Sequence, residues 1–283
     1  MDPYFLLLAF ILGTIIGSFL NVVAYRYNTG MGIGGRSKCM ACARTLTWIE
    51  LVPLASFIVQ KGACRKCKSK ISWQYPLVEF LAGALFVLIF MKFPPLSFAA
   101  GLMTFVQLVM AGLLIVIVVY DIKHKVIPNA LVYAFAVVAF LSIFLNPAGV
   151  IAGAATVVSS AVAFATPLFH LPALGDLLAG PLLALPFALL WFVSRGRWMG
   201  LGDAKIMLGI GWVLGLNAGL SAIFLAFWIG AAISIIWVLI AYHRIEGRRE
   251  IPFAPYLVLG MYLVLLFGIS VIDINPFLGI LSR

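Results

Sequence analysis

The chain has 283 residues, of which 64% are hydrophobic and only 10% are charged, and its mean hydropathy is +1.16. Water-soluble domains carry about 25% charged residues, so this composition excludes a soluble globular protein. The apolar runs are continuous and have about the 20 residues that a helix needs to cross a bilayer, unlike the short alternating segments of a membrane β-barrel. We therefore predict an all-α, polytopic membrane protein with about eight transmembrane helices.

Lysine and arginine outnumber the acidic residues and give the chain a net charge of +10. These basic residues cluster in a few loops, as they do in the cytoplasmic loops of membrane proteins. We therefore assign the charge to orientation in the lipid bilayer and expect no nucleic-acid binding.

Three regions follow one another along the chain. Residues 1–26 form a first transmembrane helix, with an apolar span at 4–25. Residues 27–75 are the only long polar stretch, and their basic bias predicts a cytoplasmic domain and an external N-terminus. Residues 76–283 form a helical membrane domain. Its predicted spans are 76–91, 96–120, 128–145, 173–194, 218–241 and 253–272, with a further short segment that ends at residue 216.

The segment 148–168 is rich in Ala, Gly, Ser and Thr and is the weakest candidate for a span. Asp121 and Asp203 both adjoin basic residues, which predicts that both lie on the cytoplasmic side. An even number of crossings must then separate them. We therefore expect 148–168 to be re-entrant or peripheral, which leaves eight crossings.

All four cysteines lie in the polar stretch, as two Cys-x-x-Cys pairs, Cys39 with Cys42 and Cys64 with Cys67. Two such pairs about 20 residues apart are typical of zinc sites, because each pair offers thiolates at the spacing of half a tetrahedron. The alternatives are two disulfides or four free thiols, and a reducing cytoplasmic location disfavours the disulfides. We predict a closed, structural Zn²⁺ site with all four cysteines as ligands.

Two aspartates stand where charged residues meet long apolar runs. Asp121 follows one run and precedes Lys123, and Asp203 ends the sequence Gly200-Leu201-Gly202-Asp203. Each has an ordinary structural interpretation, in which Asp121 ends its helix and Asp203 is the N-cap of a helix that starts at Ala204. Carboxylates at the edge of a membrane are costly, however, and are usually functional. We predict that the two converge at one membrane face and share a proton.

Such a pair can hydrolyse a peptide bond, because the ionised carboxylate takes a proton from water while the protonated one donates to the scissile carbonyl. Asp176, also preceded by glycine, competes for this role, but the predicted topology puts it at the external end of its span. Glu79 lies near the cytoplasmic end of its span, where it would pair with a basic residue or contact the substrate. Two alternatives remain open: a proton-coupled transporter or channel, and a non-catalytic zinc module that docks partners.

With these residues, the chain resembles the type IV prepilin peptidases, a Gly-x-Gly-Asp family of aspartic membrane proteases from type IV pilus and type II secretion systems. The resemblance covers nearly the whole chain. It is carried, in this order, by residues 17–23, the two cysteine pairs, and residues 71–79, 121–129, 199–205 and 252–255.

The resemblance implies that Asp121 and Asp203 are the catalytic pair. It also implies that five residues support the catalytic site: Gly200, Gly202, Lys205, Pro128 and Asn129. Glu79 and Lys123 would assist substrate binding or methyl transfer. The substrates would be prepilins and pseudopilins, cut at the cytoplasmic face of the bacterial inner membrane after the glycine that ends a short basic leader. The new N-terminus would then be methylated with S-adenosyl-L-methionine, an activity associated with the zinc-binding loop and implied by the resemblance alone.

Overall fold

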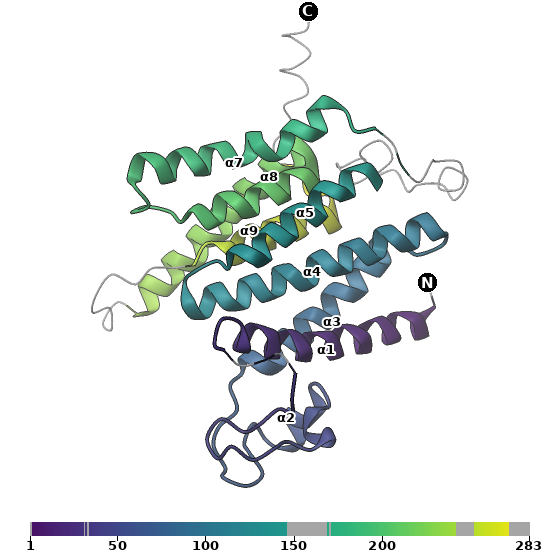
Figure 1. The fold of residues 1–283 in the computed structure, drawn as a ribbon, viewed down its shortest axis with the longest axis vertical. Coiled ribbons are helices and arrows are strands. Elements are labelled where there is room, and N and C mark those ends of the chain that lie inside the picture. Colours follow the sequence, from purple (N-terminus) through teal and green to yellow (C-terminus); the bar gives the residue numbers. More distant parts are fainter. Residues whose placement is uncertain are drawn as a thin grey trace, which may run out of the picture. The chain divides into compact units, whose positions relative to one another are not determined.

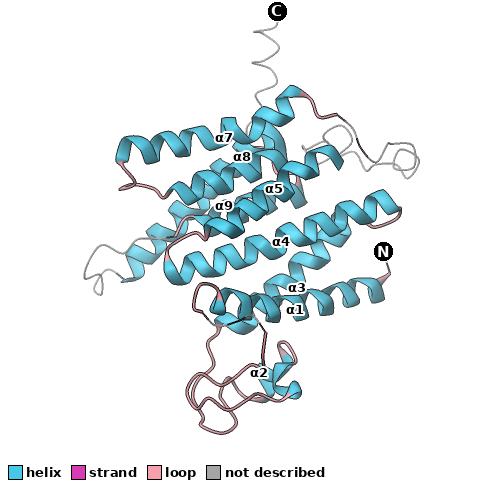
Figure 2. Cartoon of the chain, in the orientation of Figure 1, coloured by secondary structure: helices cyan, strands magenta, loops and turns pink. Residues whose placement is uncertain are grey.

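The computed structural model of the chain describes residues 2–30, 32, 34–145, 169, 171–241 and 252–271. Among these residues it contains α-helices, one short 3-10 helix and two isolated β-bridges but no strand, as Figure 2 shows. The prediction of an all-α fold is confirmed. The predicted re-entrant segment at 148–168 lies outside the described residues.

Within the described residues, five helices are long and apolar enough to cross a bilayer. They are α1 (Pro3–Arg26), α3 (Gln74–Lys92), α4 (Phe98–His124), α7 (Leu174–Ser194) and α8 (Leu201–Ala241). Two shorter apolar helices are α5 (Asn129–Leu145) and α9 (Ala254–Phe267) (Figure 1). The chain is therefore a multi-pass membrane protein.

The chain divides into two compact units. The first comprises Met1–Pro94 and Gln107–Val119, and the second comprises Pro95–Val106 and Tyr120–Arg283. The α4 helix contributes its middle to the first unit and its two ends to the second. The four cysteines therefore belong to the first unit, and both predicted catalytic aspartates belong to the second.

In the first unit, α1 and α3 pack closely through small residues. A Cβ atom built on Gly13 would lie 2.7 Å from the Cα atom of Gly83, and one built on Gly17 would lie 2.8 Å from the Cβ atom of Ala82. Small residues at such crossings let helix backbones approach, which is how membrane helices associate. Between α1 and α3 the chain forms η1 (Trp48–Leu51), α2 (Ala55–Val59) and the two cysteine turns. We call residues 27–73 the cysteine-bearing segment.

In the second unit, α8 is the central helix and contacts α5, α7 and α9. Its contact with α7 again depends on glycines, because a Cβ atom on Gly211 would lie 2.6 Å from the Cα atom of Gly180. The ring of Phe135 in α5 covers Gly209 in the same way. These close crossings fix the first half of α8, which carries Asp203.

The α8 helix bends at Gly215, whose φ of 75° and ψ of −180° are not helical. Glycine adopts this positive φ without a steric cost. The bend lies one residue before the end of the short segment predicted to end at residue 216, close to the start of the span predicted at 218–241. The two predicted segments are thus joined by a kink within one helical run.

Candidate active site and metal centre

Asp121 lies in the last turn of α4. The helix continues to His124, and Lys125 ends it in a left-handed conformation and donates its N–H to the Asp121 carbonyl at 2.7 Å. The span predicted at 96–120 therefore stops four residues short of the helix end. Asp121 is only 5% exposed, and its carboxylate accepts a hydrogen bond from the backbone N–H of Ala254, the first residue of α9.

Asp203 is the third residue of α8, which begins at Leu201. The interpretation of Asp203 as the N-cap of a helix starting at Ala204 is therefore wrong, because the helix begins three residues earlier. The Asp203 N–H donates to the carbonyl of Gly200 at 3.3 Å. Asp203 is 7% exposed, and its carboxylate lies close enough to that of Asp121 to interact with it electrostatically. Two buried acids from distant parts of the sequence thus lie together.

The loop between α4 and α5 packs against the first turn of α8. A Cβ atom on Gly202 would lie 2.7 Å from the Cβ atom of Ile127, so only glycine fits there without a shift. The Lys205 ammonium donates to the Asn129 side-chain oxygen at 2.7 Å, and Pro128 is buried. These contacts tie the loop after Asp121 to the turn that carries Asp203.

Asp176 has a structural role at the start of α7. Its carboxylate accepts the backbone N–H of Ala173 at 3.1 Å, as a helix-capping acid does. The glycine motif follows the other end of this 21-residue helix, which at 1.5 Å per residue is about 30 Å long. Asp176 therefore caps α7 far from Asp203.

The two residues predicted to support substrate binding or methyl transfer lie in different units. Glu79 belongs to the first unit, is 7% exposed, and accepts the backbone N–H of Leu54 at 2.8 Å. This partner is an amide rather than the basic side chain that we expected. Lys123 belongs to the second unit and is exposed on the last turn of α4.

The four cysteines come together, and none of them forms a disulfide. Their sulfur atoms all lie within 4.8 Å of one another, and the sulfurs of Cys39 and Cys67 are 3.7 Å apart. Thiolates bound to one zinc ion at about 2.3 Å stand about 3.8 Å apart at the corners of a tetrahedron. The cluster is therefore compatible with zinc.

Each cysteine pair lies in the same kind of turn. The N–H of Ala43 donates to the carbonyl of Cys39 at 2.9 Å, and the N–H of Lys68 donates to that of Cys64 at 3.0 Å. Ala43 and Lys68 both have a left-handed φ, 54° and 60°. The two halves of the metal site are thus local repeats of one backbone geometry.

Hydrogen bonds favour the thiolate form of two of the cysteines. The backbone N–H groups of Cys42 and Ala41 point at the Cys39 sulfur and lower the pKa of its thiol to about 6. The Ser69 hydroxyl lies 3.1 Å from the Cys67 sulfur and, with the Ser69 backbone, lowers the pKa of that thiol as well. Thiolates are the form that binds a metal. The role of Ser69 was not predicted from the sequence.

Glu50 is a second residue that the sequence reasoning missed. It is 6% exposed, its Oε1 atom lies 2.5 Å from Arg44 Nη2 and 4.0 Å from Arg65 Nε, and its Oε2 accepts the Thr47 N–H at 2.9 Å. The hydrogen bonds from Thr47 and Arg44 lower the pKa of Glu50 to about 2. The available signal was that Glu50 is the single acid among eight basic residues in the cysteine-bearing segment.

The fold and the site together define a class of protein. This class is an all-helical, multi-pass membrane protein with two neighbouring buried aspartates in one unit and a four-cysteine cluster in the other. Soluble zinc-ribbon proteins lack such spans. Two family models match the chain: the bacterial peptidase A24 N-terminal domain at residues 11–93, and the type IV leader peptidase family at residues 108–235.

Two relatives match this chain over two thirds or more of their own length. The prepilin leader peptidase/N-methyltransferase of Bacillus subtilis (strain 168) is 32% identical over 270 residues, which cover 93% of this chain and 95% of the relative. The protein of the same name from Myxococcus xanthus (strain DK1622) is 31% identical over 254 residues, with 88% and 67% covered. No solved structure matches the chain. The chain belongs to the type IV leader peptidase family and is an enzyme, which disfavours the transporter and docking-module alternatives.

We expect Glu50→Gln to loosen the cysteine turns, because it removes the charge that holds Arg44 and Arg65. Hydrogen exchange at the backbone amides of Ala43 and Lys68 should accelerate about tenfold at pH 7. The folded pKa of Glu50, about 2, lies below its ordinary value of 4.5, so the stabilisation is present above pH 4.5 and is lost as the pH falls toward 2.

The two arginines provide a graded control for this experiment. Arg44→Gln should accelerate exchange more than Arg65→Gln, because Arg44 lies 2.5 Å from the Glu50 carboxylate and Arg65 lies 4.0 Å from it. Wild-type exchange rates in Glu50→Gln would contradict the assignment.

Proposed function

We propose that this protein is a prepilin leader peptidase and N-methyltransferase of the bacterial inner membrane, with Asp121 and Asp203 as its catalytic pair. The observation that carries the proposal is that these two carboxylates are both buried and interact with each other. The relatives named prepilin leader peptidase/N-methyltransferase and the match to the type IV leader peptidase family support type IV prepilins as the substrate class, to which we add the pseudopilins. The match to the Bacillus subtilis relative covers 95% of that protein, which supports assigning the same activity to this chain.

The two carboxylates hydrolyse the leader peptide bond by acid–base catalysis. The ionised carboxylate accepts a proton from water, and the water oxygen attacks the carbonyl carbon of the scissile bond. The protonated carboxylate gives its proton to the carbonyl oxygen. The tetrahedral intermediate then collapses, the C–N bond breaks, and the leaving amine takes the proton held by the first carboxylate while the second regains its own. Because the groups share one proton, neither role belongs to one residue before the substrate binds.

The position of the pair in the helices suits a prepilin. Asp121 is in the last turn of α4 and Asp203 is in the first turn of α8, so both lie at helix ends rather than at mid-membrane. A prepilin has a polar leader followed by an apolar helix, which places the cleavage point at the membrane surface. Basic residues next to each aspartate support the cytoplasmic face.

Zinc is the cofactor that the cysteine cluster supports best. Cys39, Cys42, Cys64 and Cys67 would complete a closed four-thiolate site, which leaves no position for a substrate. Zinc in such a site contributes folding energy rather than catalysis. We retain residues 27–75 as the zinc-binding domain and 76–283 as the peptidase domain.

S-adenosyl-L-methionine is the proposed methyl donor, and a groove in the first unit does not match its chemistry. The molecule carries a positive sulfonium, a charged amino-acid end and ribose hydroxyls. This groove lies between α1 and residues 37–53 and is lined by apolar and serine side chains without a charged group, so it does not fit these features. We therefore derive no step of methyl transfer.

Loss of either aspartate should abolish cleavage. We expect Asp121→Asn and Asp203→Asn, each assayed as purified full-length protein on a prepilin substrate, to lower the cleavage rate by about a hundredfold or more. Asp176→Asn is the matched control: it should cut normally and lose about 1 kcal/mol of helix capping at most. Normal cleavage by either dyad variant would refute the pair.

Gly202→Ala should disturb the pair without touching a carboxylate. The added Cβ atom would lie 2.7 Å from the Ile127 Cβ and shift the first turn of α8. Because a displacement of about 1 Å can cost up to about a hundredfold in rate, we expect cleavage to fall at least about tenfold. Gly175 occupies the same helix position in α7 with no atom within 4 Å, so Gly175→Ala should keep full activity. Equal rates for the two variants would contradict this positioning role.

Elemental analysis should give about one zinc ion per chain. We expect Cys64→Ser to lose the metal and to keep leader cleavage, while N-methylation falls at least about tenfold. Ser72→Ala, exposed and outside the cluster, should change neither readout. Equal loss of cleavage and methylation in Cys64→Ser would instead mean that the cysteine turns hold the whole fold together.

A further inference from the structure

The cysteine-bearing segment exposes a row of large apolar side chains. Residues 48–59 include a single charged side chain, Glu50, which is turned inward onto Arg44. Trp48 is 76% exposed and Ile58 is 74% exposed. We define the apolar patch by the following exposed residues: Trp48, Leu51, Val52, Ile58, Val59 and Trp73. Contacts between η1 and α2, and between the rings of Phe57 and Trp73 at 4.9 Å, make it one surface. Such a surface marks an interaction site.

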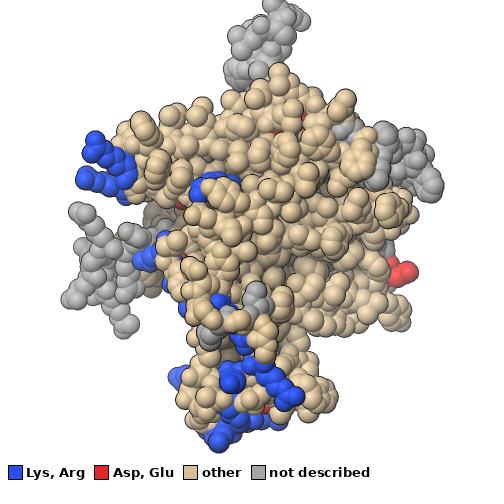
Figure 3. Space-filling model, in the orientation of Figure 1, with Lys and Arg blue, Asp and Glu red and all other residues tan. Residues whose placement is uncertain are grey.

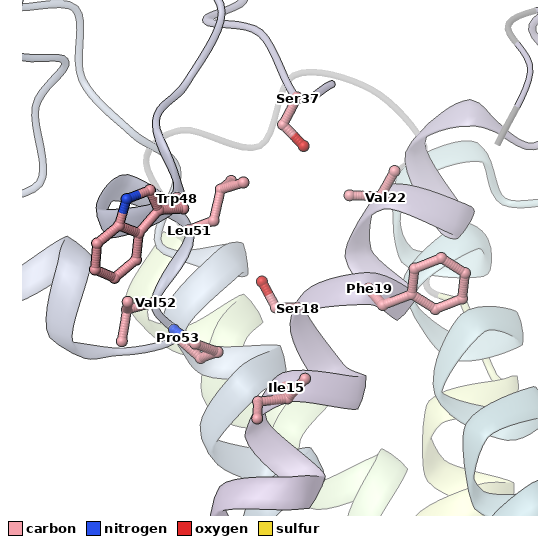
Figure 4. Close-up of a pocket in the computed structure, with 9 residues that line it drawn as sticks. All are labelled: Ile15, Ser18, Phe19, Val22, Ser37, Trp48, Leu51, Val52 and Pro53. Atoms are coloured by element: carbon pink, nitrogen blue, oxygen red, sulfur yellow. The ribbon is translucent and has the colours of Figure 1, made fainter. Parts of the chain in front are cut away.

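The patch lies alongside α1 rather than beyond its end. A groove of about 430 Å³ separates the two, and Figure 4 shows its lining: Ile15, Ser18, Phe19 and Val22 of α1, with Ser37, Trp48, Leu51, Val52 and Pro53. Ile15 and Val22 stand 11 and 4 residues before Arg26, which places the groove about 6 to 16 Å along the helix from that end. Because α1 spans the membrane, this range covers the headgroup region and the outer hydrocarbon of one leaflet.

A hydrogen bond to α3 gives an independent measure of the depth. Glu79 accepts the Leu54 N–H at 2.8 Å and stands five residues, or about 7.5 Å, inside the start of α3 at Gln74. Leu54 has a left-handed φ of 58° and joins η1 to α2, where helical hydrogen bonding is interrupted. An unpaired backbone N–H is costly in lipid, and the Glu79 carboxylate satisfies this one.

The same segment is strongly basic on its surface. Its one acid is buried, whereas seven of its eight basic side chains are exposed: Arg36, Lys38, Lys61, Arg65, Lys66, Lys68 and Lys70. Figure 3 shows these positive charges gathered over the segment. Basic clusters next to a membrane span are attracted to anionic lipid headgroups.

We propose that the cysteine-bearing segment docks on an anionic phospholipid leaflet and inserts its apolar patch into it. The hydrocarbon chains lie against the patch and in the groove beside α1, and the exposed basic side chains lie at the headgroups. Trp48 and Trp73 take the interfacial position that tryptophan prefers in membranes. The segment is then a monotopic element held between two spanning helices. The inference does not depend on the peptidase assignment, because it uses only α1, α3 and the segment between them.

Tryptophan fluorescence tests the insertion on the full-length protein in vesicles of phosphatidylcholine and phosphatidylglycerol. Ile58→Trp reports on the patch, and Lys66→Trp reports on the basic surface between Cys64 and Cys67. We expect bromine atoms on the acyl chains to quench the fluorescence added by Ile58→Trp at least about threefold more than that added by Lys66→Trp. Iodide in the water should quench in the opposite order. Zinc content and near-wild-type solubility establish that each variant is folded. If Ile58→Trp does not fold, Val59→Trp replaces it as the reporter on the patch.

Three results would overturn the proposal. Equal iodide quenching of Ile58→Trp and Lys66→Trp would mean that the patch faces water. Protection of Ile58→Trp from both quenchers would mean that a protein, such as a second copy of this chain, covers it. Acyl-chain quenching that is unchanged when phosphatidylglycerol is omitted would remove the anionic lipid from the proposal, since we expect a fall of at least about twofold.

Discussion

The structure of the second unit depends on keeping two carboxylates inside an apolar helical assembly. A charged group in such surroundings is costly unless its neighbours compensate it. Asp121 and Asp203 are 5% and 7% exposed, and the elements around them restrict how they can move. The start of α9 donates to Asp121, and the loop before α5 packs on the glycine that precedes Asp203. Burying the two carboxylates costs folding free energy, and several separate contacts keep them in place.

The helices could be predicted from the sequence because apolar runs of spanning length have few other stable forms in a bilayer. The cysteine cluster could be predicted because the spacing of two Cys-x-x-Cys pairs is local. The end of α4 was missed by four residues, because charged residues from Asp121 to His124 ended the apolar run but not the helix. Glu50 was missed because its partners come from both cysteine turns, and no local pattern shows that contact.

The tripeptide Leu-Gly-Asp shows what local sequence can and cannot predict about an aspartate and its surroundings. It occurs at residues 174–176 and 201–203, and in both places it forms the first three residues of a helix. Asp176 remains half-buried and caps its own helix, whereas Asp203 is buried. The glycines differ in the same way, since Gly175 has open space around it and Gly202 lies against Ile127. The tripeptide is the same at both places, so the different burial of the two aspartates comes from their tertiary neighbours.

Four acids are buried among the described residues, and their close neighbours differ. Glu50 forms ion pairs with two arginines, and Glu79 accepts a backbone N–H. In each case a donor stabilises the buried carboxylate. Asp203 instead has another acid, Asp121, as a close neighbour. Two like charges in low dielectric cannot both ionise easily, so their proximity opposes folding. This arrangement supports our proposal of a catalytic pair, because a proton shared between two carboxylates is what peptide hydrolysis by an acid–base pair requires.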